Sequence, residues 1–337
     1  MSAGGLDFFV LTGFLGSGKT SLLRDVLSAD TASDTAVIVN EAGEVGLDGV
    51  LLRESGDDVP LAMLSNGCVC CQAGSDLAFT IDRLIMAPRP DGLPPLRRII
   101  LETSGLSMPG PVLRQLATLA EHHLRVAVIA TYDLTRGLAV ATFEEAVAQW
   151  AAAHRIVATK ADLAPQALTE APVAIAQLNP VAEGIVNADR AALASAAFAP
   201  LAASLPLRDV APDLAAAHPR LALCLVRPPA EIAYADLASW LDNVAGALGE
   251  RLLRIKGLVK VHEAPGPLLV ESVGTMFSPP RQLSAANPPA PFIVVIARDI
   301  VRAELEQVPP SDLFAFSWRD PDSGAAQPRG IRAEWVT

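Results

Sequence analysis

The chain has 337 residues, of which 51% are hydrophobic and 19% are charged. This apolar content is enough for a packed core, which excludes wholesale disorder, and the length predicts about two domains. The formal net charge is −11. Neither half of the chain has a basic excess, which disfavours nucleic acid and anionic membrane surfaces as partners. With no export signal at the start and no run of about 20 strongly apolar residues, we expect a cytoplasmic protein without a membrane span.

Short apolar runs alternate with segments of helical spacing through the first half of the chain. The runs predicted as strands are Asp7–Thr12, Val37–Asn40, Leu61–Leu64, Arg98–Glu102, Arg125–Thr131 and Arg155–Thr159. The segments predicted as helices are Thr20–Leu27, Ser75–Met86, and stretches near 110–121 and 142–152. Because nearly continuous apolar strands need both faces covered, this order predicts an α/β fold with a mostly parallel sheet flanked by helices.

The second half of the chain begins after a stretch rich in Ala and Pro, residues 190–219, where we place a domain boundary. Beyond it we expect a smaller α+β domain with strands at Arg220–Val226, Leu268–Val273 and Phe292–Arg298 and helices at Ile232–Leu248 and 300–307. The expected division is a first domain at 1–190, a linker at 191–219, a second domain at 220–316 and a loosely held tail at 317–337. A basic group around Gly257 is expected to form a solvated turn, with a docking site for an acidic client as the alternative; it comprises Arg251, Arg254, Lys256 and Lys260.

The segment Gly13-Phe-Leu-Gly-Ser-Gly-Lys-Thr20 fits the pattern G-x-x-x-x-G-K-[ST], follows a predicted strand and opens a predicted helix. Such a loop turns its backbone N–H groups toward phosphates, and the helix N-terminus adds positive potential. We expect Lys19 to reach the β- and γ-phosphates and the Thr20 hydroxyl to ligate Mg²⁺. The predicted phosphate-binding residues are Gly13, Gly16, Ser17, Gly18, Lys19, Thr20 and Ser21. The alternative is an ordinary Gly-rich turn, but the full pattern in this context favours a P-loop NTPase domain.

Glu102 ends a predicted strand and is followed by Thr103-Ser104-Gly105. A carboxylate at the end of a strand beside the phosphate loop is where a P-loop enzyme places its magnesium-binding acid. We therefore expect Glu102 to act with Lys19 and Thr20 in catalysis and to share Mg²⁺ with Thr20. The alternative is a solvated carboxylate at a strand end. Gly105 is expected to bring a backbone N–H close to the γ-phosphate.

The segment Thr159-Lys160-Ala161-Asp162 follows the last strand predicted in the first domain. The Asp162 carboxylate can accept hydrogen bonds from N1–H and N2–H₂ of guanine, which adenine does not offer, so the site is expected to select GTP. The Lys160 stem can lie over the base plane. Thr159 stands where Asn is usual, although Thr-Lys-x-Asp resembles the motif of signal-recognition-particle GTPases. The alternative is an ATPase with an accidental Lys-x-Asp.

Three of the four cysteines lie in one tetrapeptide, Cys68-Val69-Cys70-Cys71. Three thiols beside Gly67 can supply soft ligands to one transition-metal ion, and Glu41 is a candidate for the fourth position. Zn²⁺ is expected to bind best, and Co²⁺ is compatible with the same ligands. The alternatives are a buried trio of small hydrophobic side chains or a redox pair. Cys224, alone in an apolar run, is interpreted as a packing residue.

These motifs, in the order GFLGSGKT, Asn40–Asp48, SNGCVCC, ETSGL and TKAD, resemble those of the CobW-type metallochaperone GTPases. These proteins are relatives of the GTPases that insert nickel into urease and hydrogenase, and they include zinc chaperones. The resemblance implies that Cys-x-Cys-Cys binds zinc and that the nucleotide state changes metal affinity. It also implies that Asn40–Asp48 is a switch segment, with Asp48 near Mg²⁺ or the γ-phosphate. A histidine-rich stretch common in this family is missing from the Ala/Pro-rich region.

The function expected from the sequence is that of a GTP-dependent metallochaperone, which delivers a transition metal, zinc by preference, to a client metalloprotein. No catalytic Gln or arginine finger stands out, so we expect slow intrinsic hydrolysis of GTP. One alternative is a zinc-sequestering protein with a regulatory nucleotide site, and another is a cobalt-handling protein of cobalamin or nitrile hydratase maturation. A third is an ATP-using kinase with structural cysteines, against which Asp162 argues.

Overall fold

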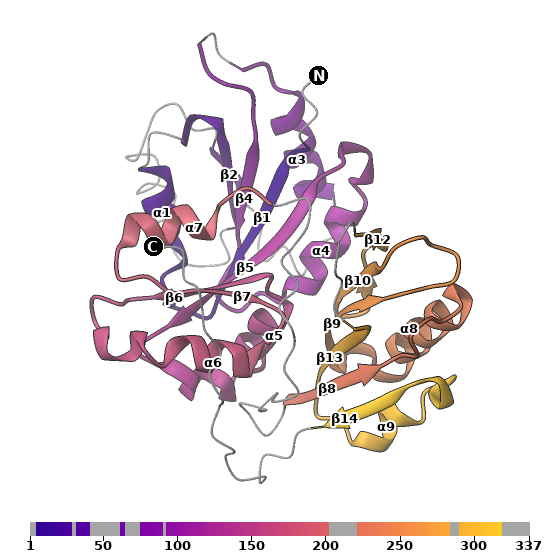
Figure 1. The fold of residues 1–337 in the computed structure, drawn as a ribbon. Coiled ribbons are helices and arrows are strands. Elements are labelled where there is room, and N and C mark those ends of the chain that lie inside the picture. The colour runs from indigo at the N-terminus through magenta and orange to yellow at the C-terminus, as the bar shows by residue number, and fades with distance from the viewer. Residues whose placement is uncertain are drawn as a thin grey trace.

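The computed structural model describes residues 5–28, 32–40, 61–64, 75–89, 92–201, 221–283 and 290–318. These residues form two sheets of different kinds, one parallel and one antiparallel, each with its own helices (Figure 1). The predicted fold class, a P-loop type α/β domain with a smaller α+β domain, is confirmed.

The parallel sheet has seven strands among the described residues, in the order β3-β2-β4-β1-β5-β6-β7, and every adjacent pair is parallel. Its strands are β1 (Asp7–Thr12), β2 (Thr35–Asn40), β3 (Leu61–Leu64), β4 (Arg98–Glu102), β5 (Arg125–Asp133), β6 (Arg155–Thr159) and β7 (Glu183–Ile185). All six strands predicted for this half are present. β7 was not predicted, because a three-residue strand of sequence Glu-Gly-Ile has no recognisable pattern.

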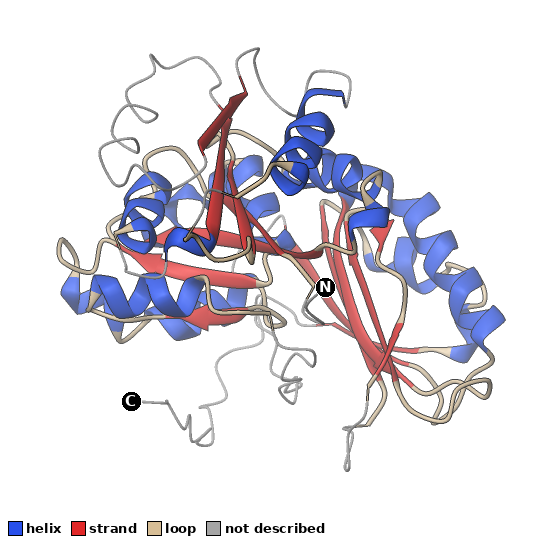
Figure 2. Ribbon diagram, turned by 90° about the horizontal axis from the view of Figure 1, so that it is seen from above, coloured by secondary structure: helices blue, strands red, loops and turns tan. Residues whose placement is uncertain are grey.

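Helices cover both faces of this sheet (Figure 2), which is why its strands are apolar almost throughout. On β1, Phe9 and Leu11 pack toward one face, whereas Phe8 and Val10 pack toward the other. The first face is covered by α1 (Lys19–Leu27) and α7 (Arg190–Ala197), and the second by α3 (Ser75–Met86) and α4 (Pro109–Ala117). The β5–β7 side is covered by α5 (Glu144–Ala152) and α6 (Ala171–Leu178).

Helix α7 occupies residues that the sequence led us to expect at the start of a linker. Leu193 and Ala194 are buried against the sheet, and the ring of Phe198 meets that of Phe9 edge-on at 5.6 Å between centroids. The periodicity was weak because most buried positions of this short helix are alanines, which differ little from their neighbours in hydropathy. The division of the chain into domains stays a prediction.

The second sheet is antiparallel, in the order β11-β10-β9-β13-β8-β14, with β12 paired to β10. Its strands are β8 (Leu221–Arg227), β9 (Leu252–Val259), β10 (Leu268–Val273), β11 (Met276–Phe277), β12 (Arg281–Gln282), β13 (Phe292–Arg298) and β14 (Ala315–Trp318). Helices α8 (Tyr234–Leu248) and α9 (Arg302–Glu306) pack against one face, where Trp240 stacks on Phe314. The first two residues of the expected tail, Ser317 and Trp318, belong to β14.

The basic segment around Gly257 is not a turn, so this expectation was wrong. It is β9, buried along its whole length. A Cβ at Gly257 would lie 2.6 Å from the carbonyl oxygen of Phe292 on β13, so the glycine permits close strand contact and does not reverse the chain. Of the four basic residues, Arg254 and Lys256 are buried. Arg251 pairs with Glu304 and Lys260 with Glu231 at the surface.

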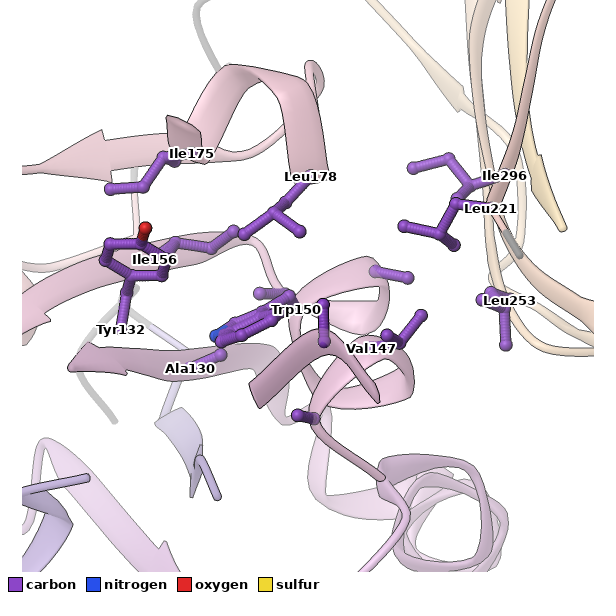
Figure 3. Close-up of a cluster of buried hydrophobic side chains, with 14 of the residues drawn as sticks. Ala130, Tyr132, Val147, Trp150, Ile156, Ile175, Leu178, Leu221, Leu253 and Ile296 are labelled. Carbon is purple, nitrogen blue, oxygen red and sulfur yellow. The ribbon is translucent and has the colours of Figure 1, made fainter. Parts of the chain in front are cut away.

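The two domains share one apolar core. Trp150 and Leu178 of the first domain belong to the same buried cluster as Leu221, Leu253 and Ile296 of the second (Figure 3). The antiparallel sheet is therefore covered on both faces, by α8 on one and by the first domain on the other. Among the described residues, none of the helices has the length and apolar content that crossing a membrane requires.

Polar contacts add to this junction. The Arg254 guanidinium donates a hydrogen bond to the Ala152 carbonyl, with 2.9 Å between nitrogen and oxygen, and the Lys256 ammonium donates to the Val181 carbonyl at 3.3 Å. Both cations lie 3.6 Å from a carboxylate oxygen of Glu271. Burial, with nearby Arg254 and Lys256, holds the pKa of His154 well below its usual value, and its Nδ1 accepts the Val128 N–H. His154 is therefore neutral near pH 7.

Candidate nucleotide site

The carboxyl ends of β1, β4, β5 and β6 bring four loops to one edge of the parallel sheet, the place where open α/β sheets bind their ligands. The loop after β1 carries the G-x-x-x-x-G-K-[ST] motif, and the loop after β4 begins at Glu102. The other two loops begin at Asp133 and Lys160. We call this region the nucleotide edge.

The phosphate loop is folded tightly against β5. Gly13 has φ +148°, and a Cβ there would lie 1.9 Å from Thr131 Oγ1, so no larger residue fits without rearrangement. Ser17 Oγ hydrogen-bonds Thr131 Oγ1 at 2.6 Å. Helix α1 begins at Lys19, and its first turn carries N–H groups with no acceptor within the helix. The loop therefore presents N–H groups and a positive helix end, as an anion site requires.

Lys19 lies across the phosphate loop. Its Nζ donates to the Gly13 carbonyl at 2.9 Å and to the Phe14 carbonyl at 3.4 Å, and the residue is only 9% exposed. An ammonium group held by the carbonyls of this loop is placed to bind the oxygens of a polyphosphate.

Thr20 and Glu102 meet at the first turn of α1. Thr20 Oγ1 donates to Glu102 Oε1 at 2.7 Å, and Glu102 is 6% exposed. The strand register explains this contact, because Glu102, the last residue of β4, pairs with Leu11 on β1, just before the phosphate loop. A hydroxyl and a carboxylate are hard oxygen ligands of the type that Mg²⁺ prefers. The residues present therefore fit a magnesium ion.

The loop after Glu102 packs directly on the phosphate loop. The Thr103 N–H donates to the Leu11 carbonyl at 2.9 Å. A Cβ at Gly105 would lie 2.7 Å from both N and Cα of Leu15, so only glycine allows this approach. The Gly105 and Ser107 carbonyls each accept a hydrogen bond from the buried amide of Gln149, on α5, at 3.0 Å.

The predicted base-binding residues lie next to the same loop. Thr159 Oγ1 donates to the Ser17 carbonyl at 2.7 Å, which links the end of β6 to the phosphate loop. Lys160 has φ +62°, and its Nζ lies 2.6 Å from Asp133 Oδ2. Burial raises the pKa of Asp133, but hydrogen bonds from Lys160 and Thr135 outweigh it and lower the net value. The Asp162 side chain is exposed.

Four residues at this edge were not singled out from the sequence: Thr131, Asp133, Arg136 and Gln149. Asp133 ends the apolar run of β5, and that position was a usable signal. Arg136 donates to the Leu15 carbonyl at 3.0 Å, and its loop position gave no clue. Gln149 was recognisable only as a polar residue among alanines on a helix that proves to be almost wholly buried.

The predicted transition-metal ligands Cys68, Cys70, Cys71 and Glu41 lie outside the described residues, as does Asp48. In the part of the chain that the structure describes, no group of three His, Cys, Asp or Glu side chains is placed to hold a metal ion. Cys224 is buried in β8, and burial raises the pKa of its thiol to about 12, which confirms its interpretation as a packing residue.

A parallel sheet with this loop between β1 and α1, and a strand-end acid beside the first helical turn, defines a P-loop nucleotide-binding domain. The family model for the CobW/HypB/UreG nucleotide-binding domain matches residues 7–185, and that for the cobalamin synthesis protein cobW C-terminal domain matches residues 222–308. The chain belongs to the CobW/HypB/UreG family of P-loop GTPases. The resemblance stated from the motifs is thereby confirmed.

Several similar proteins have names that state a function. The chain is 31% identical to a zinc chaperone CobW of Pseudomonas aeruginosa over 89% of both proteins. It is 34% identical to the zinc chaperone YjiA of Escherichia coli over 47% of this chain and 50% of that protein. The crystal structure of Zn(II)-bound YjiA GTPase from E. coli superposes with a TM-score of 0.63 at 21% identity, over 90% of this chain and 98% of that one, which shows a shared fold.

Proposed function

We propose that this protein is a GTP-dependent zinc chaperone, which binds Mg·GTP at the nucleotide edge and zinc at Cys68, Cys70 and Cys71 and passes the metal to a client metalloprotein. The names of its relatives support the chaperone role. The observation that carries the nucleotide half is the 2.7 Å contact between Thr20 and Glu102 beside the phosphate loop. The cytoplasmic location expected from the sequence stays a prediction.

In this proposal each residue of the nucleotide edge has one task. The backbone of Gly13–Gly18, with Ser17 and Ser21, surrounds the phosphates, and Lys19 neutralises the β- and γ-phosphate oxygens. Thr20 and Glu102 hold Mg²⁺, which supplies positive charge to the transferring phosphoryl group. Gly105 offers its N–H to the γ-phosphate. Thr159 orders the start of the base loop, Lys160 covers the base, and Asp162 accepts from guanine.

Strand register supports a link between this edge and the metal ligands. Asn40, the last residue of β2, is the register partner of Leu64, the last residue of β3. Glu41 follows Asn40 directly in the sequence, and Cys68 comes four residues after Leu64. This register is consistent with our proposal that Glu41 is the fourth zinc ligand beside the three cysteines.

We further propose that the nucleotide controls the metal through Asn40–Asp48. Asp48 contacts Mg²⁺ or the γ-phosphate while GTP is bound, and hydrolysis to GDP and phosphate releases the segment and changes the geometry at the thiols. Thermodynamic linkage then requires different zinc affinities in the GTP and GDP states.

The decisive experiment is a paired zinc titration of the whole chain with excess Mg·GDP or excess Mg·GTP analogue that cannot be hydrolysed, followed by thiol accessibility. We expect one zinc per chain, three protected thiols and a nucleotide-dependent Kd. Cys68→Ser should weaken zinc binding, whereas Cys224→Ala, a matched control in β8, should not. Equal Kd values for zinc with the two nucleotides would contradict the coupling and favour the alternative of a zinc-sequestering protein. Tighter binding of Co²⁺ than of Zn²⁺ would favour the cobalt-handling alternative.

Hydrolysis is tested separately. Thr20→Val removes the hydroxyl at nearly constant volume and should lower magnesium-dependent GTP turnover by about 100-fold or more, whereas Thr20→Ser, which keeps the hydroxyl, should retain most of it. Phosphate release at saturating GTP is the measurement. Equal activity of the two variants would contradict the role of Thr20.

A further inference from the structure

A fully buried glutamine joins helix α5 to the nucleotide edge. Gln149 is 0% exposed, and its amide nitrogen donates to the Gly105 carbonyl and to the Ser107 carbonyl, each at 3.0 Å. An amide nitrogen has two N–H donors, and both are used on one short loop. The loop receives these bonds from a residue more than 40 positions away in the chain.

The loop after Glu102, which Gln149 holds, lies directly against the phosphate loop. Glu102 begins this loop, and Gly105 packs so closely on Leu15 of the phosphate loop that a Cβ would lie 2.7 Å from its backbone. A shift of the loop by a few tenths of an ångström therefore moves the Gly105 N–H relative to the phosphate loop. Two carbonyls fixed by one side chain restrict the backbone that directly follows that N–H.

Helix α5, which carries Gln149, is itself held from three sides. Trp150 Nε1 donates to the Thr131 carbonyl on β5 at 3.0 Å. Asn179 Nδ2 donates to the carbonyls of Trp150 and Ala151 at 2.9 and 3.0 Å. Arg254 of the second domain donates to the Ala152 carbonyl. Helix α5 cannot rotate or slide without breaking these bonds. Gln149, which α5 carries, therefore holds the loop after Glu102 in one position.

We propose that Gln149 is a positioning residue for the γ-phosphate side of the site: it fixes the Gly105–Ser107 backbone so that the protein distinguishes a triphosphate from a diphosphate. This inference rests on the proposed function. In the proposed site the β-phosphate contacts come from the phosphate loop itself, whereas both hydrogen bonds of the Gln149 amide nitrogen go to the loop after Glu102. Loss of Gln149 should therefore affect GTP and GDP unequally.

The test compares binding of Mg·GDP and of a non-hydrolysable Mg·GTP analogue to the whole chain. Gln149→Leu removes both N–H donors and keeps a side chain of similar size. It should raise the Kd for the GTP analogue about tenfold, the order expected for a lost pair of buried hydrogen bonds. The Kd for GDP should change less than threefold. The kcat for GTP should fall as well. Gln149→Met, which fills the space with a more adaptable side chain, is the second variant should the leucine prevent folding.

The control is Ser272→Ala, because Ser272 is also a buried hydrogen-bonding side chain, which accepts the Ile255 N–H, but it lies in β10 and belongs neither to α5 nor to the loop after Glu102. It should lower Tm comparably and leave the ratio of the two Kd values unchanged. If Gln149→Leu raised the Kd values for both nucleotides by the same factor, Gln149 would have only a structural role and the inference would be wrong. If the unmodified protein bound no GTP analogue at all, the proposed function would fail, which is a separate result.

Discussion

Thr159 joins two parts of the nucleotide edge through one hydroxyl. Its Oγ1 donates to the Ser17 carbonyl, and its side chain lies 3.4 to 3.6 Å from where a Cβ on Gly18 would be. Asn, the more usual residue at this position, has a longer side chain with an amide. The smaller Thr therefore brings the base loop into direct contact with the phosphate loop, which explains why this departure from the usual motif is compatible with a nucleotide site.

Gly105→Ala is expected to destabilise the protein and weaken nucleotide binding. Its Cβ would lie 2.7 Å from backbone atoms of Leu15, which cannot move aside as a flexible side chain would. Overpacking of this kind costs roughly 1–3 kcal/mol of unfolding free energy, measurable by urea denaturation. Gly246→Ala is the control, because a Cβ at Gly246 in α8 meets nothing within 4 Å and should be neutral or stabilising. Equal losses in both variants would contradict the packing argument.

Asp162→Asn should change the base that the protein prefers. In the proposed base site the carboxylate accepts hydrogen bonds from guanine N1–H and N2–H₂, whereas an amide can donate to the 2-oxo group of xanthine. Because Asp162 is exposed, the fold should be unaffected. Competition between labelled GTP and XTP measures the change, and we expect a gain for XTP with a loss for GTP. Unchanged preference would mean that the base is bound elsewhere.

At the scale of the element, the strands of the parallel sheet and β9 show what a local sequence pattern can and cannot predict. Strands in the parallel sheet were found because both faces of each lie in one core, so their apolar character is visible locally. In β9, Arg254 and Lys256 face the first domain, and the carbonyls that accept their hydrogen bonds lie 102 and 75 residues away in the chain. A local pattern of basic residues beside glycine is typical of a turn, and the burying partner was not predictable from it.

The same reasoning applies to the site. The places of the phosphate loop, Glu102 and the base loop at one edge of the sheet could be predicted because each lies at or directly after a strand end that is visible in the sequence, while their roles stay predictions. The role that we propose for Gln149 could not be predicted, since it depends on where α5 lies in space relative to residues 105–107.

Asp189→Ala is expected to cost about 1 kcal/mol of unfolding free energy, because Asp189 is the N-cap of α7 and accepts the Ala192 N–H at 2.7 Å. Helix α7 covers one face of the sheet, so the loss should appear in global stability measured by chemical denaturation. Asp236→Ala removes the same charge from the first turn of α8, where it is not the N-cap, and should cost less. If both variants lost the same unfolding free energy, the loss would come from the removed charge and not from the N-cap hydrogen bond.

At the scale of the whole molecule, the two domains meet through a charged group that is largely buried. Glu271 lies within 3.6 to 3.7 Å of three cationic side chains, Arg254, Lys256 and Arg281. A single carboxylate does not balance three cations, and desolvation of the ammonium lowers the pKa of Lys256 to about 8 despite Glu271. The junction is therefore sensitive to pH.

The sign of this sensitivity follows from proton binding. In the unfolded chain Lys256 keeps its proton up to about pH 10.4, whereas in the folded protein it loses it near pH 8. Between these values the unfolded state binds more protons, so this residue should increase stability as pH rises, and its charge lowers stability below pH 8. Lys256→Met should remove that slope while Arg254 and Arg281 still pair with Glu271. Denaturation midpoints from pH 7 to 10 measure it, and identical slopes would contradict the assignment.

The apolar cluster that runs from Trp150 to Ile296 also sets a limit on how this architecture can be recombined. A chimera that exchanges the C-terminal domain with that of a relative must match the surface of α5, not only the connecting segment. The Ala152 carbonyl at the end of α5 accepts a hydrogen bond from Arg254, and Glu144 at its start pairs with Arg298, so a foreign domain lacking these cations would lose both contacts. The C-terminal domain and the surface of α5 that it covers therefore have to be exchanged together.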